Sequence, residues 1–207
     1  MAPTRHTLSL PPLRLRHEFA RKALHLSTGL IPVIYAFGAP RWVLEALLVL
    51  TSALALLIEF LRRVDATIDE RINSAFGPFM REHEKRSIAG ATWLSLSCLV
   101  VVLVLSREAA ISALWCVAVG DPAAAIAGRW WTASRQSRPR SKSGKTIVGT
   151  LACAVVSFAG VWMLADYSPA AAAIIAAAGA AAEAIPWGLD DNVMVAGAAG
   201  AAAQLLA

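Results

Sequence analysis

Asp121 is the residue of this sequence whose surroundings most favour chemistry. It stands in Gly120-Asp121-Pro122, inside a long apolar stretch where a carboxylate is costly and therefore a candidate for function. Pro122 lacks a backbone N–H and disfavours helix at the residue before it. We predict that the helix breaks here and that Asp121 caps a half-helix beside a polar cavity. Simple helix N-capping without chemistry is the alternative.

Further acidic side chains lie at the ends of later apolar stretches. Glu183 lies near the end of one stretch, and Asp190-Asp191-Asn192 opens the next. Carboxylate and amide oxygens are ligands that Mg²⁺ accepts together with water and phosphate oxygens. The sequence thus predicts a magnesium site formed by Asp121, Asp191 and Asn192. Ordinary N-capping by one of the two neighbouring aspartates stays open.

A basic segment precedes the stretch that begins near residue 147. Lys142-Ser143-Gly144-Lys145-Thr146 resembles the tail of a P-loop, but Pro139 stands where the first glycine of that motif would be. Glycine still lets the backbone approach a phosphate, lysine neutralises it, and a helix amino terminus adds N–H donors. We therefore predict a nucleotide-binding surface made by Arg129, Lys142, Gly144, Lys145, Thr146, Gly149 and Thr150.

The first apolar stretch carries a third polar group at its beginning. Arg21 and His25 are four residues apart and share one helix face, with Lys22 beside them. We predict that Arg21, Lys22 and His25 close the site on the substrate. Membrane anchoring by the two cations and an ordinary polar role for His25 are the alternatives.

Other ionisable or reactive residues have structural explanations. Glu59 is one turn from Arg62 and Arg63, which favours a local ion pair. The cysteines are odd in number, lie in apolar stretches and lack CxxC spacing, so we expect small core residues at Cys98, Cys116 and Cys153.

Composition places these residues in a membrane protein. Of the 207 residues 57% are hydrophobic and only 16% are charged, with a mean hydropathy of +0.59. Soluble domains have about 25% charged residues. The length allows one domain and excludes a separate catalytic module.

The sequence contains seven apolar stretches, whose lengths can be compared with the roughly 20 residues that a helix needs to cross a bilayer. We predict an all-α polytopic bundle of about seven transmembrane helices. A basic cytoplasmic segment, 1–20, would precede a single transmembrane domain, 21–207. The stretches are 24–39, 42–61, 89–105, 109–130, 147–165, 169–185 and 192–207.

The basic residues predict the orientation of the bundle. Of 19 Lys and Arg residues, all but Arg41 and Arg107 fall on the side of the amino terminus and of loops 62–88 and 131–146. The positive-inside rule places that side in the cytoplasm. Within 62–88 we expect an interfacial helix that ends near Gly77-Pro78. Membrane insertion and anionic lipid explain most of this charge, and we expect no nucleic-acid partner.

In order along the chain, these motifs resemble those of the polyprenol-type lipid kinases, the family of phytol kinase, dolichol kinase and CTP-dependent diacylglycerol kinase. The resemblance spans residues about 20 to 200. Leu189-Asp190-Asp191-Asn192, after Glu183-Ala184-Ile185-Pro186, looks most like phytol kinase. The other motifs are Arg21-Lys22-Ala23-Leu24-His25 with Gly29, Glu84 before Gly90-Ala91-Thr92-Trp93, Gly120-Asp121-Pro122-Ala123-Ala124 with Gly128-Arg129, and Lys145-Thr146-Ile147-Val148-Gly149-Thr150.

This resemblance implies Mg²⁺-dependent transfer of the terminal phosphate of CTP to a membrane lipid alcohol, phytol or another isoprenoid alcohol. It implies catalytic roles for Asp121, Lys145, Glu183 and Asp191, with Glu183 or Asp121 accepting the alcohol proton. Thr146 and Thr150 replace commoner serines, and Ala196 stands where the family often has proline. We expect a bacterial inner-membrane protein with its site facing the cytoplasm, in contact with membrane lipids and able to form oligomers.

Two other functions stay open. A phosphatidate cytidylyltransferase uses the same nucleotide and metal but attacks the α-phosphate, and its fuller acidic and glycine-rich signature is not visible here. A small transporter could also use an intramembrane carboxylate in a broken helix. The outer half of the bundle, however, offers little polarity beyond Glu45 and Glu108.

Overall fold

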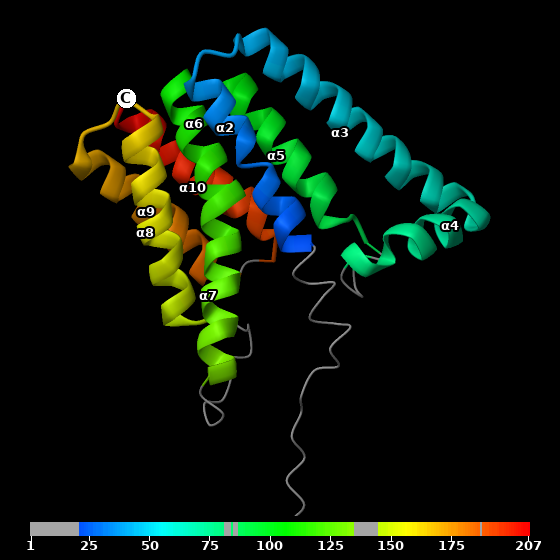
Figure 1. The fold of residues 1–207 in the computed structure, drawn as a ribbon. Coiled ribbons are helices and arrows are strands. Elements are labelled where there is room, and N and C mark those ends of the chain that lie inside the picture. The colour runs from blue at the N-terminus through cyan, green and yellow to red at the C-terminus, as the bar shows by residue number, and fades with distance from the viewer. Residues whose placement is uncertain (1–20, 81–83, 85–86, 135–144, 187) are drawn as a thin grey trace, which may run out of the picture.

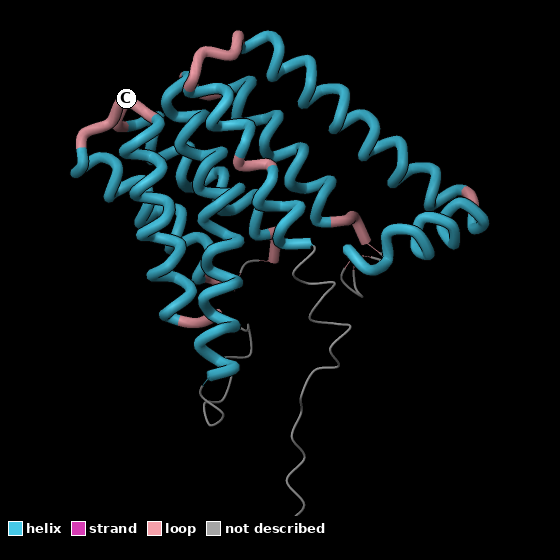
Figure 2. Tube along the Cα trace, in the orientation of Figure 1, coloured by secondary structure: helices cyan, strands magenta, loops and turns pink. Residues whose placement is uncertain are grey.

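The helices of this protein are seen in a computed structural model that describes residues 21–80, 84, 87–134, 145–186 and 188–207. Within those ranges the chain is helix and connecting loop, which confirms the all-α prediction (Figure 2). Among the described residues, three helices are long and apolar enough to cross a membrane: Arg41–Val64, Arg107–Ala133 and Ile147–Leu164. Gly90–Val104 and Pro169–Ala184 are shorter apolar helices.

Most predicted stretches coincide with one helix each. Ser106, Thr146, Ser168 and Asp190 cap the helices that follow them, because each side-chain oxygen accepts a backbone N–H of the first turn. The helices are α3 Arg41–Val64, α5 Gly90–Val104, α6 Arg107–Trp115, α7 Asp121–Ser134, α8 Ile147–Leu164, α9 Pro169–Ala184 and α10 Asp191–Leu205.

The first stretch is divided rather than continuous. Residues 21–27 are helical, Thr28 and Gly29 form a turn, and α2 runs over Leu30–Ala36. Pro32 supplies the reason, since it has no N–H to offer the Thr28 carbonyl four residues earlier. Ile31 uses that carbonyl instead, at 3.0 Å.

The predicted break at Asp121 is wrong. The backbone stays helical from Arg107 to Ala133, and Asp121 itself has helical dihedrals of φ −62° and ψ −46°. A π-helical turn, η2 Cys116–Gly120, joins α6 to α7 directly before Asp121, and Pro122 is the second residue of α7. Such a turn widens the helix where the proline cannot donate, so the chain continues instead of starting a new half-helix.

The joined helix of α6, η2 and α7 is the centre of the bundle. In the most apolar 18-residue stretch of this helix 72% of the residues are buried, whereas the corresponding fractions are 22% for α3 and 28% for α8. α8 packs against α7 and α9, and α10 packs against α9, α6 and α5. α3 contacts mainly α5 and lies at the edge of the bundle (Figure 1). It turns many apolar side chains outward, a surface that suits lipid. Those exposed residues include Leu47, Leu50, Leu54 and Leu57.

A helix follows α3 where the sequence predicts an interfacial helix, and its place at the membrane surface stays a prediction. α4 runs over Ala66–Phe76 and ends in the short helix η1 Gly77–Phe79, near the expected Gly77-Pro78. Asp65 caps α4 by accepting from Thr67 and Ile68. Figure 1 shows α4 folded back beneath the end of α3. The predicted cytoplasmic side of this helix stays a prediction.

Candidate active site

A buried ion pair joins the beginning of the described chain to α7. Lys22 Nζ donates to Asp121 Oδ2 at 2.8 Å, across 99 residues of sequence. The two side chains are only 7% and 10% exposed. His25 Nδ1 lies 3.7 Å from the same carboxylate oxygen, too far for a hydrogen bond. The structure therefore brings together two of the three residues predicted to close the site and the leading catalytic candidate.

A second group forms where α8, α9 and α10 meet. Lys145 Nζ, just before α8, donates to Glu183 Oε1 at 3.0 Å and to Asp191 Oδ2 at 2.9 Å. Thr150 Oγ1 stands 3.5 Å from Glu183 Oε2, at the limit of a hydrogen bond. The ends of three consecutive helices thus bring together the residues predicted as catalytic, apart from Asp121.

The two groups belong to neighbouring helices. α7, which carries Asp121, packs against α8, which begins just after Lys145. The crossing is close, because a Cβ on Gly149 would lie 2.7 Å from the Ala124 carbonyl oxygen. Gly149 therefore lets the helices touch backbone to backbone. We call the two groups together the lysine–carboxylate site: Lys22, Asp121, Lys145, Glu183 and Asp191.

Lys145 keeps its positive charge in this setting. Burial alone would lower its pKa, but the hydrogen bonds that Lys145 donates to the Asp191 and Glu183 carboxylates outweigh burial and raise the pKa above the ordinary lysine value. The side chain is a permanent cation at neutral pH, as phosphate binding requires.

The remaining predicted nucleotide-binding residues are placed differently. Lys142 and Gly144 lie outside the described residues. Thr146 caps α8 by accepting from Gly149 N at 3.0 Å, so that N–H is already used. Arg129 is partly buried in α7, eight residues after Asp121, and Arg21 is partly buried beside Lys22. Nucleotide binding by these residues stays a prediction.

The predicted magnesium ligands each have a protein partner, and magnesium binding by them stays a prediction. Asn192 Nδ2 donates to Asp190 Oδ1 at 2.7 Å and lies 3.4 Å from the Gly90 carbonyl, whereas Asp191 pairs with Lys145. Among the described residues there is no group of three or more His, Cys, Asp or Glu side chains arranged to hold a metal. One aspartate of the pair does serve as a cap, because Asp190 accepts from Asn192 N.

Glu59 and the cysteines have the structural roles expected for them. Glu59 Oε1 lies 3.6 Å from Arg62 Nη1 and also accepts from Ala89 N at 2.8 Å, which holds the beginning of α5 against α3. Cys98, Cys116 and Cys153 are free and buried.

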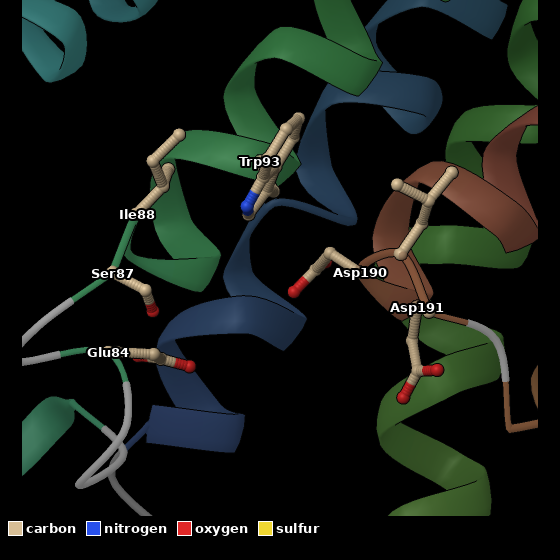
Figure 3. A pocket seen from close by; sticks show the side chains of 8 residues that line it. Glu84, Ser87, Ile88, Trp93, Asp190 and Asp191 are labelled. Atoms are coloured by element: carbon tan, nitrogen blue, oxygen red, sulfur yellow. The ribbon is translucent and has the colours of Figure 1, made fainter.

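Sequence reasoning missed a cavity beside the second group. A hollow of about 290 Å³ is bordered by Glu84, Trp93, Asp190 and Asp191 (Figure 3). In the sequence, Glu84 belongs to the motif that continues with Gly90-Ala91-Thr92, and it was not predicted as a site residue. The sequence signal that could have indicated the cavity is the acidic side chain of Glu84 in a basic loop just before a helix. That this side chain is only 4% exposed becomes known only from the fold.

The comparison with known proteins gives one similar relative. The chain is 27% identical over 195 residues to CTP-dependent diacylglycerol kinase 1 of Schizosaccharomyces pombe (strain 972), covering 87% of this chain and 89% of the relative. This match supports the lipid kinase family. No family model and no solved structure matches the chain.

A lipid kinase must bring a nucleotide phosphate and a membrane-held hydroxyl to one place. The lysine–carboxylate site lies between helices whose outward faces are apolar, and it contains two cations with three carboxylates. Cations can neutralise phosphate, and a carboxylate can accept a hydroxyl proton. The arrangement has the groups that phosphoryl transfer to a lipid needs.

Proposed function

We propose that this protein transfers the γ-phosphate of CTP to the hydroxyl of a membrane lipid alcohol. The observation that carries the proposal is Lys145, held between Glu183 and Asp191 just before α8, which packs against the helix that carries Asp121. In the reaction the bond from the γ-phosphorus to its bridging oxygen breaks, and a bond to the alcohol oxygen forms. CDP leaves, and the alcohol proton passes to Glu183 or Asp121.

Charge neutralisation is the main task of the site. Phosphoryl transfer needs positioning and electrostatic stabilisation more than covalent help. Lys145 would exchange one carboxylate for a phosphate oxygen, while the other carboxylate keeps it in place. Arg129, Lys142, Gly144, Thr146, Gly149 and Thr150 would form the rest of the phosphate surface. Arg21, Lys22 and His25 would close it from the first helices.

Magnesium suits the donor chemistry of this site. Mg²⁺ is commonly bound through one or two carboxylates plus substrate phosphates and water, so a preformed protein cage is not required. Asp121 and Asp191 would hold the ion, with Asn192 as the third predicted ligand. When bound, it would neutralise phosphate charge. Lys22 and Lys145 would balance those carboxylates in its absence.

The hydrophobic part of the acceptor would remain in lipid. We propose that an isoprenoid alcohol such as phytol is the acceptor, on the motif Leu189-Asp190-Asp191-Asn192, with diacylglycerol as the acceptor to compare. The protein would span the membrane seven times in a bacterial inner membrane. Its lysine–carboxylate site would face the cytoplasm, where CTP is available.

One assay tests the reaction. Purified protein receives Mg²⁺, a lipid alcohol and CTP labelled separately at the α- and γ-phosphates. Label from the γ-position in the lipid is the expected result. Label from the α-position would instead mean cytidylyl transfer, and no labelled lipid from any acceptor would leave a transporter as the better explanation.

A panel of acceptors then tests the substrate class. Phytol, farnesol, a longer polyprenol and diacylglycerol are compared at equal surface concentration in mixed micelles. We expect the highest kcat/KM with an isoprenoid alcohol. A clear preference for diacylglycerol would overturn that part of the proposal and keep the kinase.

A further inference from the structure

The cavity beside the lysine–carboxylate site has a mixed lining. Glu84, Asp190 and Asp191 contribute carboxylates, Trp93 forms an aromatic wall, and Ser87 adds a hydroxyl. Figure 3 shows the indole nitrogen of Trp93 pointing into the hollow. Such a combination of flat apolar surface and directed polar groups is typical of small-molecule sites.

Two carboxylates are drawn together where α5 begins. A Cβ on Gly90 would lie 3.2 Å from Glu84 Oε1 and 3.9 Å from Asp190 Oδ2. Glu84 is 4% exposed, so its carboxylate is held inside the protein. Both acids stand at the amino end of a 15-residue helix, whose dipole stabilises negative charge.

The cavity and the proposed phosphate site share one residue. Asp191 borders the cavity and also binds Lys145 at 2.9 Å. A nucleotide whose phosphates lie on Lys145 therefore has its nucleoside within reach of this hollow. The reverse orientation is unfavourable, because three carboxylates would repel a triphosphate.

We propose that the cavity holds the nucleoside part of the nucleotide and selects cytosine, a proposal that rests on the kinase function above. Glu84 and Asp190 accept the exocyclic amine of cytosine and a ribose hydroxyl, and Trp93 packs against the pyrimidine ring. A carboxylate matches the amine donor of cytosine, whereas uracil carries a carbonyl acceptor at that position. The volume of about 290 Å³ suits a single small nucleoside.

The test compares CTP with UTP as phosphate donors. Glu84→Gln keeps the size of the side chain but adds an amide donor that can meet the uracil carbonyl. We expect the ratio of kcat/KM for CTP to that for UTP to fall about ten-fold in this variant. Trp93→Leu should raise the KM for CTP several-fold and leave the KM for the lipid alcohol unchanged.

Glu45→Gln is the matched control, since Glu45 pairs with Arg41 far from the cavity. It should leave the CTP to UTP ratio unchanged. Protection against thermal unfolding by CTP, measured without lipid, gives a second readout: wild type is protected more by CTP than by UTP, and Glu84→Gln loses the difference. A variant that fails to purify is replaced by Glu84→Asp, expected to lower the ratio less.

The outcomes separate the two proposals. If wild type transfers no γ-phosphate from either nucleotide, the kinase function fails. If wild type is an active kinase, but the ratio and the KM for CTP are unchanged in Glu84→Gln and Trp93→Leu, the cavity does not bind the nucleoside.

Discussion

The two ends of the bundle hold their charges in different ways. In Figure 1 the α2–α3 junction and the start of α6 lie at the upper end, and the end of α7 lies at the lower end. At the upper end Arg41 binds Glu45, four residues away, and the carbonyl oxygens of Leu103 and Leu105. Arg107 donates to the Tyr35 carbonyl at 2.7 Å and lies over its ring.

In the lysine–carboxylate site, by contrast, each cation binds carboxylates from other helices. Lys22 reaches Asp121, and Lys145 reaches Glu183 and Asp191. Arginines that bind main-chain carbonyls hold helix ends together, and they have few side-chain partners that a ligand could replace. Buried lysines between carboxylates are costly to assemble, yet they can exchange a partner for a phosphate or a metal ion. The difference assigns anchoring to one end and chemistry to the other.

Removing the carboxylate at the centre of the site should have the largest effect. Asp121→Asn is expected to lower turnover about 10³-fold, because the site loses its metal ligand or proton acceptor. The lost partner of Lys22 also costs stability, so the double variant Lys22→Met with Asp121→Asn is prepared beside it. Lipid kinase assays and thermal unfolding in detergent measure the two effects. Retained activity in Asp121→Asn would remove this residue from the proposed role.

Loss of Lys145 comes next. Lys145→Met leaves Glu183 and Asp191 without their shared cation, and we expect activity to fall about 10²-fold. Lys145→Arg keeps the charge and should lose less. The kcat and the KM for CTP are measured for both. Equal losses in the two variants would show that shape, rather than charge, is what matters at this position.

The helix crossing beneath the site predicts a smaller, structural effect. Gly149→Ala places a methyl group against the Ala124 carbonyl and should destabilise the protein by about 1–3 kcal/mol while lowering activity. Gly197→Ala, exposed on α10 with nothing within 4 Å, is the matched control and should stabilise slightly. Equilibrium unfolding compares them. A neutral Gly149→Ala would mean that α7 and α8 separate easily.

At the upper end, a substitution should lower the stability of the protein without changing its activity. Arg107→Gln loses a hydrogen bond to the Tyr35 carbonyl and a cation–π contact, which together are worth about 1–2 kcal/mol. We expect a lower unfolding temperature and unchanged kcat/KM. A loss of kcat in this variant would break the assignment of anchoring to one end and chemistry to the other.

The smallest effect concerns pH. The pKa of Lys145 is raised, so the stabilisation from its charge is complete below the unfolded-state pKa and is lost only as pH rises through the still higher folded value. Between about pH 7 and about pH 9 neither lysine nor arginine at this position loses its proton. The activity ratio of wild type to Lys145→Arg should therefore be constant over that range. A ratio that falls toward alkaline pH would show that Lys145 is a weaker base than the structure indicates.

Local signals predicted most of the helices and the residues of the site. Capping residues such as Ser168 and Thr146 mark helix starts in any context, and a carboxylate such as Asp121 stands out in an apolar stretch. The π-helical turn could not be predicted, because a proline gives the same local signal for a break and for a widened turn. The ion-pair partners could not be predicted either, because the pairing of Lys145 with Glu183 and Asp191 depends on how three helices pack.

The π-helical turn also explains how the central helix accommodates an extra residue. Cys116–Gly120 carries one residue more than an α-helical path would need, and each residue turns an α-helix by about 100°. Because the wide turn absorbs that residue, Asp121 can face Lys22 while α6 keeps its packing. Deleting Ala118 would let the segment relax to an α-helix with both flanks in nearly the same orientation. A single-residue deletion in this turn should therefore cost less than the same deletion in the regular turns of α7, which would rotate one part of the helix against the other.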